Sequence, residues 1–173
     1  MKLKSALMAS LFLAALNTLA PAQAQVYALE DPVDWKEAEV PPPPAFDVKK
    51  LVVFEVSPNS QLVYGVDPAA IRISQKDGIV RYVMVASNAS GASNVMYEGI
   101  RCSTGEFKTY ARYSSDGKWT NVSDPQWRSL FDNMPSKHAL RFARAGACDS
   151  AAPATSVDVL VSRLKNPNFR MAD

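Results

Sequence analysis

Six short segments rich in β-branched and aromatic residues follow one another between residues 51 and 114. They read LVVFEV, QLVYGV, AIRIS, IVRYVMVAS, NVMYEGIRC and FKTYARYS. Turn-forming residues separate them, and the Asp77-Gly78 pair between two such runs is a strong hairpin signal. This pattern restricts the chain to an antiparallel sheet, because tight turns join only antiparallel neighbours.

The sequence pattern becomes helical after residue 124. Asp124 and Pro125 are typical of an N-cap and a first helical position. Trp127, Leu130 and Phe131 follow at the spacing of one apolar helix face. This spacing predicts a helix that begins near Asp124.

Two further helices are expected nearer the C-terminus. One runs from Ser136 to Ala145 and ends at Gly146, and the other covers the segment SVDVLVSRLK. The predicted fold class is α+β: a single domain with a curved antiparallel sheet of five to six strands, covered by C-terminal helices.

The first 24 residues are typical of a secretory signal peptide. Two lysines precede an apolar stretch from Ala6 to Leu16, and Ala22-Gln23-Ala24 supplies the small residues that a signal peptidase needs. The stretch is shorter than the ~20 residues required to span a bilayer, which argues against a membrane anchor. We therefore expect cleavage after Ala24 and export to the periplasm, with no transmembrane segment in the mature protein.

The charge of the chain balances once the signal peptide is removed. The whole sequence has 19 Lys+Arg and 17 Asp+Glu, so loss of Lys2 and Lys4 leaves 17 of each. A neutral protein gives no reason to expect a nucleic-acid partner.

Residues 25–50 form an acidic, proline-rich N-terminal segment, called the arm below. Pro41 to Pro44 impose extended geometry, and Trp35 and Phe46 are its large side chains. Such a segment serves either as a strap on its own domain or as a ligand for a groove on another protein. The remaining organisation is an α+β domain at residues 51–165 and a tail at residues 166–173.

Cys102 and Cys148 are the two cysteines of the chain. An even number in an oxidising compartment favours a disulfide, and two free buried thiols are the alternative. The bridge would close a loop worth about 4 kcal/mol of stability in the chain-entropy model.

The hairpins assign side chains to the two faces of the sheet, because paired residues share a face. We expect Ser74 beside Ile79 and Cys102 beside Phe107. The predicted core face contains Ile71, Ile73, Val80, Tyr82, Met84, Met96, Ile100, Cys102, Phe107 and Tyr113.

Glu98 belongs to this core face and is expected to be buried. A buried carboxylate needs partners. One interpretation is a structural hydrogen-bond hub with donors such as Tyr82, Trp127 or a backbone N–H. The other is an acid of raised pKa in a site.

The opposite face, called the basic face below, concentrates cations and tyrosines. Its predicted members are Arg72, Arg81, Arg101, Lys108 and Arg112, with Tyr97 and Tyr110. Like charges on neighbouring strands repel, so something should compensate them. Solvent, the acidic arm between Glu30 and Glu39, or an external anion are the three possibilities.

Motifs for known catalytic chemistry are missing from the sequence. His138 is the single histidine, which excludes a multi-histidine metal site, and it is expected as a surface or packing residue. No nucleophile elbow or phosphate-binding loop occurs. No cofactor is expected.

The most distinctive residues resemble the cryptic neisserial protein family. They are Asp77-Gly78, Arg81-Tyr82, Asn94, the run from Tyr97 to Cys102, Lys108, Tyr110 and Trp119. The resemblance extends from about Trp35 to Leu164. It implies a small exported protein of a Gram-negative envelope with no assigned activity and a periplasmic location.

Two functions remain open. The first is a non-enzymatic binding or structural module that uses the basic face to contact an envelope protein or an acidic ligand. The second is a hydrolase-like enzyme with Glu98 as general acid or base.

Overall fold

The structure is a computed structural model that describes residues 35–166 and residue 169. The predicted signal peptide and the arm before Trp35 lie outside the described residues, as does most of the tail.

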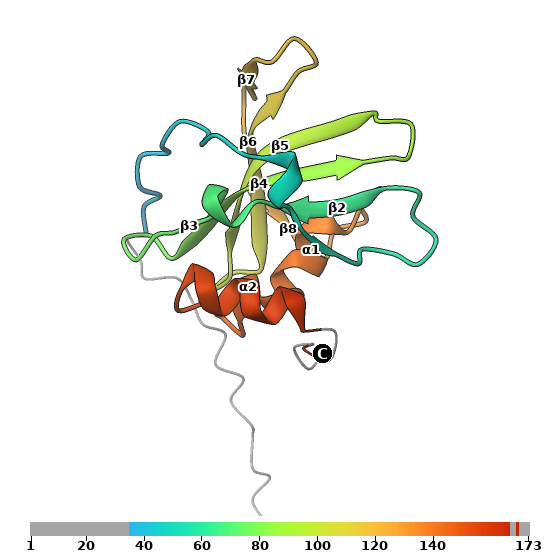
Figure 1. Cartoon of the computed structure of the whole chain (residues 1–173). Helices are drawn as coiled ribbons and strands as arrows, with labels where there is room; N and C mark the ends of the chain where they lie inside the picture. The colour runs from blue at the N-terminus through green and yellow to red at the C-terminus, as the bar shows by residue number, and fades with distance from the viewer. Residues whose placement is uncertain (1–34, 167–168, 170–173) are drawn as a thin grey trace, which may run out of the picture.

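An antiparallel sheet of eight strands forms the body of the molecule (Figure 1). Its main path runs β1-β2-β4-β5-β6-β7, while β3 pairs with β4 and β8 pairs with β6. The strands are β1 (Val52–Phe54), β2 (Val63–Val66), β3 (Arg72–Ile73), β4 (Ile79–Ser87), β5 (Ser93–Arg101), β6 (Glu106–Tyr113), β7 (Trp119–Asn121) and β8 (Arg128–Ser129). A separate two-stranded ribbon pairs β9 (Cys148–Asp149) with β10 (Ala152–Pro153).

The long central strands lie where the sequence pattern predicts them. The predicted hairpin is confirmed, because Ser74 N–H donates to the Ile79 carbonyl and Arg72 pairs with Arg81. Tyr82 pairs with Glu98, which places both on the same face of the sheet.

Helices cover one face of the sheet near the C-terminus (Figure 1). They are α1 (His138–Phe142), which continues into a π-helical turn η3 (Ala143–Ala147), and α2 (Val157–Lys165). Short 3₁₀ turns lie at η1 (Val48–Lys50) and η2 (Pro68–Ala70). The α+β prediction is confirmed.

The helix predicted from Asp124 is wrong. This segment contains β8 and irregular chain, in which Arg128 pairs with Phe107 and Leu130 N–H donates to the Gly105 carbonyl. Leu130 is buried, whereas Phe131 is exposed. Pairing with β6 therefore overrides the helical spacing, and the apolar residues do not share one buried face.

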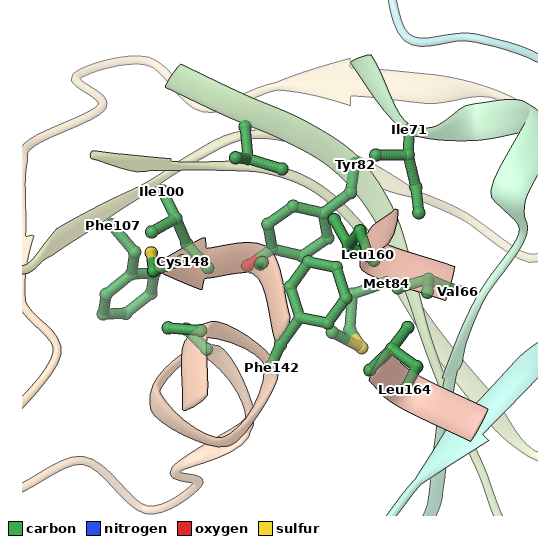
Figure 2. Close-up of a cluster of buried hydrophobic side chains, with 14 of the residues drawn as sticks. Val66, Ile71, Tyr82, Met84, Ile100, Phe107, Phe142, Cys148, Leu160 and Leu164 are labelled. Carbon is green, nitrogen blue, oxygen red and sulfur yellow. The ribbon is translucent and has the colours of Figure 1, made fainter. Parts of the chain in front are cut away.

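The main hydrophobic core lies between the sheet and the helices (Figure 2). Phe142 of α1 packs against Tyr82 of β4, with their ring centroids 4.4 Å apart. Leu160 and Leu164 of α2 close the same cluster. Nearly every predicted core residue lies here, which confirms the face assignment of β4 and β5.

A bulge in β6 corrects the face assignment at the end of that strand. Glu98 pairs with Thr109 but Tyr97 pairs with Ala111, so Tyr110 is the extra residue. Beyond the bulge the faces are exchanged. Arg112, predicted on the basic face, pairs with Met96 of the core face, and Tyr113, predicted in the core, packs on the opposite side.

The register before the bulge differs from the predicted one by two residues, because Phe107 pairs with Ile100 rather than with Cys102. A shift of two residues leaves every side chain on its predicted face.

The Cys102–Cys148 disulfide joins the end of β5 to the end of the π-helical turn, over a separation of 46 residues. Gly146 lies in this turn with φ of +136°, and a Cβ there would lie 2.6 Å from Cβ of Arg163 in α2. Glycine thus permits the close approach of α2 to the turn that carries Cys148.

Candidate functional site

The arm covers the part of the basic face that contains Arg81, Lys108 and Tyr110. Glu37 of the arm lies over β4 and β6, where its carboxylate is surrounded by donors. Tyr110 donates to Oε1 at 2.7 Å, Arg81 Nη2 lies 3.4 Å from the same oxygen, and Lys108 Nζ donates to Oε2. Three side chains from β4 and β6, the two strands that flank β5, therefore converge on one carboxylate, in the geometry of a carboxylate-binding site.

Tyr110 reaches Glu37 for two local reasons. Tyr110 is the extra residue of the β6 bulge, and bulges are common next to sites. Gly99 of β5 leaves the space that the ring occupies, because a Cβ at this position would collide with the Tyr110 hydroxyl. Burial, together with the Glu37 carboxylate, raises the pKa of Tyr110, so the phenol remains a donor.

Asp77 supplies the second negative charge beside Arg81. Its Oδ2 accepts from Arg81 Nη2 at 2.7 Å, and Arg81 is only 3% exposed. Burial alone would raise the pKa of Asp77, but hydrogen bonds from Arg81, Ser74 and the Ala38 backbone outweigh it and lower the pKa to about 2. The arginine is thus compensated by one fixed acid of the sheet and one acid of the arm.

Asp77 also holds the arm backbone and its first aromatic side chain. Its carboxylate accepts from Ala38 N–H at 3.0 Å, and its carbonyl accepts from Trp35 Nε1 at 3.1 Å. The turn that joins β3 to β4 is therefore a docking point for the arm. The sequence identified Asp77 only as a turn residue.

Trp35 packs between a cation and a second indole. The Arg101 guanidinium carbon lies 3.4 Å from the Trp35 ring centroid, and the Trp127 ring meets it edge-on with centroids 6.2 Å apart. Lys108 Nζ lies 4.7 Å from the Trp127 centroid. Cation–π contacts of this kind contribute roughly 0.5–2 kcal/mol each. Trp127, one of the possible donors to Glu98, lies instead on the arm side of the sheet.

The far end of the arm is held by aromatic packing and one backbone bond. Phe46 meets Tyr113 and Trp119 at centroid distances of 5.3 and 6.1 Å. Asp47 N–H donates to the Asp67 carboxylate at 2.8 Å. Between the two anchored ends, the prolines form one wall of a hollow of about 420 Å³ whose other wall includes Tyr97 and Tyr110.

Two predicted members of the basic face lie outside the Glu37 site. Arg72 donates to the carbonyls of Ala69 and Ile71 and remains exposed. Arg112 lies on the core side of the sheet, as described above. Tyr97 is buried beneath the arm, where burial raises its pKa against the opposing effect of Arg81 and Arg72.

Glu98 is the polar centre of the opposite face and is 0% exposed. Tyr82 donates to Oε2 at 3.1 Å and Thr109 donates to Oε1 at 3.0 Å. His138 Nε2 lies 2.9 Å from Oε2. The hydrogen-bond hub with Tyr82 therefore exists, and its third member is a histidine that sequence reasoning placed on the surface or in packing. Their separation of 40 residues leaves no local sequence signal for this pair.

Within residues 35–166, no group of three or more His, Cys, Asp or Glu side chains could hold a metal ion, and no helix is long and apolar enough to cross a bilayer.

Together, the fold and the site define an α+β protein whose basic sheet face binds a carboxylate of its own arm. The chain belongs to the CNP1-like family, whose model matches residues 30–165. This match includes the described arm. Neither a curated protein nor a solved structure matches the chain.

Replacement of Glu98 by alanine should destabilise the protein by about 3 kcal/mol, because it leaves Tyr82, Thr109 and His138 buried without their acceptor. The exposed Glu55→Ala variant is the control and should change stability by less than about 0.5 kcal/mol. Urea denaturation of both variants measures the difference. Equal stabilities would contradict the role of Glu98 as a hub.

Proposed function

We propose that this protein is exported to the bacterial periplasm and acts there as a binding module for carboxylate-bearing ligands, through its basic face. The export part is supported by the predicted signal peptide and by the Cys102–Cys148 disulfide, which suits an oxidising compartment. The family match assigns no activity that would favour another reading.

The convergence of Arg81, Lys108 and Tyr110 on one carboxylate carries the binding proposal. Each donor is held by strand geometry, and Arg81 is further fixed by Asp77. A preorganised group of donors binds an anion without the cost of ordering it first. The aromatic rings beside it, Trp127 and Tyr110, suit a ligand that combines an acid with an apolar group.

The arm is the resident ligand of this site. A tethered group competes at an effective concentration on the order of millimolar, so a simple free carboxylate displaces it poorly. A partner therefore needs several acidic or aromatic groups, as an acidic protein segment has. In this proposal the arm combines the two roles considered for it. It is a strap on its own domain, and it occupies the site that an external ligand would bind.

Burial of Glu98 argues against the hydrolase-like alternative in which this residue itself is the general acid or base. At 0% exposure its carboxylate is closed off from a substrate by Tyr82, Thr109 and His138. A general acid or base must lie within hydrogen-bond reach of the reacting group. Glu98 itself is therefore better explained as a structural acid.

The export proposal predicts the covalent state of the protein in cells. Protein recovered from the periplasmic fraction should begin at Gln25, and thiol labelling after denaturation without reductant should find no free cysteine. Mass spectrometry of the intact chain checks both. A retained N-terminal segment, or two labelled cysteines, would contradict it.

The binding proposal predicts that Glu37→Ala opens the site. Poly-glutamate should bind this variant at least about tenfold more tightly than the wild-type protein, with an affinity that falls as salt rises. Isothermal titration at two salt concentrations measures both effects. Deletion of residues 25–45 should act in the same way and also lower stability, because Trp35 is lost.

Two matched variants control this experiment. Glu39→Ala removes an exposed acid of the same arm and should leave the affinity at the wild-type value. Adding Lys108→Gln to Glu37→Ala should reverse the gain. If Glu37→Ala and the deletion bind no better than the wild-type protein, the face is a closed structural contact and the proposal fails.

A further inference from the structure

A series of hydrogen-bonded polar side chains lies on the core face of the sheet, between β5 and the start of α1. Ser136 precedes α1 and its Oγ lies 3.1 Å from His138 Nδ1. The other ring nitrogen of His138, Nε2, lies 2.9 Å from Glu98 Oε2. Serine, imidazole and carboxylate therefore stand in series.

The hydrogen-bond partners show which group in this series carries each hydrogen. Burial, together with Glu98, raises the pKa of Tyr82 well above its usual value, so its hydroxyl is a donor to the carboxylate. Thr109 is the second donor. With Glu98 as the acceptor, Nε2 of His138 carries the hydrogen that donates to it. In the neutral ring Nδ1 is then an acceptor, and the Ser136 hydroxyl is its donor.

The remaining partners of Ser136 agree with this assignment. Tyr64 Oη lies 3.1 Å from Ser136 Oγ, and the backbone N–H of His138 donates to Oγ at 3.3 Å. A hydroxyl has one hydrogen to give and two lone pairs to fill. If the hydrogen points to Nδ1, the two lone pairs accept from Tyr64 and from the backbone.

Aromatic packing fixes the plane of the imidazole. The Tyr64 ring stacks parallel to it with centroids 6.0 Å apart, and Phe107 meets it edge-on at 6.1 Å.

The three polar residues differ in solvent exposure: Glu98 and His138 are buried, whereas Ser136 is half-buried. The member that would meet a substrate is thus the accessible one.

We propose that Ser136 is a nucleophile for acyl transfer, with His138 as its general base and Glu98 as the positioning residue that orients the ring. A nucleophile beside a base that a third group orients is the arrangement that activates serine. The substrate class is carboxylic esters with a short acyl group, which need no deep acyl pocket. The site is independent of the basic face, which lies on the other side of the sheet.

The reaction balances without a metal or redox partner. Ser136 Oγ attacks the ester carbonyl carbon while its proton moves to His138 Nδ1. The bond to the alcohol breaks, and the alkoxide takes that proton and leaves. Water then attacks the acyl-serine and gives one proton to Nδ1. The bond from Oγ to the acyl carbon breaks, the carboxylic acid leaves, and Oγ regains its proton.

The Tyr64 hydroxyl is a candidate donor to the oxyanion that forms on the carbonyl oxygen. Tyrosine side chains can serve in this role. Loss of this donor through Tyr64→Phe should lower the rate, whereas a purely structural Tyr64 would change only stability.

Ester hydrolysis and covalent labelling test the proposal on the full mature chain. The wild-type protein should react with a fluorophosphonate probe at Ser136 and hydrolyse p-nitrophenyl acetate. Ser136→Ala should abolish labelling and lower hydrolysis at least about 100-fold. Ser156→Ala is the matched control: it removes the serine that caps α2 and should retain both activities. Failure of the wild-type protein to label, or labelling elsewhere, would overturn the proposal.

A second measurement examines the proton assignment without reliance on activity. The chain has one histidine, so nitrogen NMR of the untagged protein observes the His138 ring without ambiguity. The expected signal is a hydrogen on Nε2, which faces Glu98, and none on Nδ1, which faces Ser136. A hydrogen on Nδ1 would make Ser136 an acceptor there and would overturn the proposal.

Discussion

Burial of Arg81 is the constraint on which the described structure depends most directly. This arginine lies in the centre of the sheet and is almost inaccessible to solvent. A buried cation without partners would cost several kcal/mol, so the fold must deliver acids to it. Asp77 arrives from the adjacent turn, and Glu37 arrives on the arm. The docked arm therefore both covers the sheet and helps to compensate the charge of Arg81.

The two faces of β5 meet different acids, Glu98 of β5 itself and Glu37 of the arm. Glu98 points to the helices, whereas Gly99 faces the arm and leaves room for Tyr110. Both acids accept from a tyrosine and from basic or polar neighbours. Glu98 is enclosed in the core, whereas Glu37 is carried by the arm, which can detach from the sheet. This difference supports a structural role for Glu98 and a binding role for the face that Glu37 covers.

Local pattern predicted the central strands and the burial of Glu98, because alternation and hairpin turns set faces without distant information. Prediction from local pattern failed where contacts between residues far apart in the sequence determine the structure. The bulge at Tyr110 exchanged the faces of the residues after it, and pairing with β6 replaced the helix expected around Trp127. His138 was missed as a partner because its acid comes from β5, far away in the sequence. A strap was one of the two roles considered for the arm, but its docking on Asp77 carried no sequence signal.

The central claim is that the Glu37 carboxylate holds the arm on the basic face. A double-mutant cycle between Glu37→Gln and Lys108→Gln, read by urea denaturation at low ionic strength, tests it most directly. Both side chains are largely buried, at 16% and 12% exposure, so screening removes only part of their interaction. The account predicts a coupling free energy of about 1 kcal/mol or more. Effects that add within about 0.3 kcal/mol would show that the two groups do not interact, and would contradict the account.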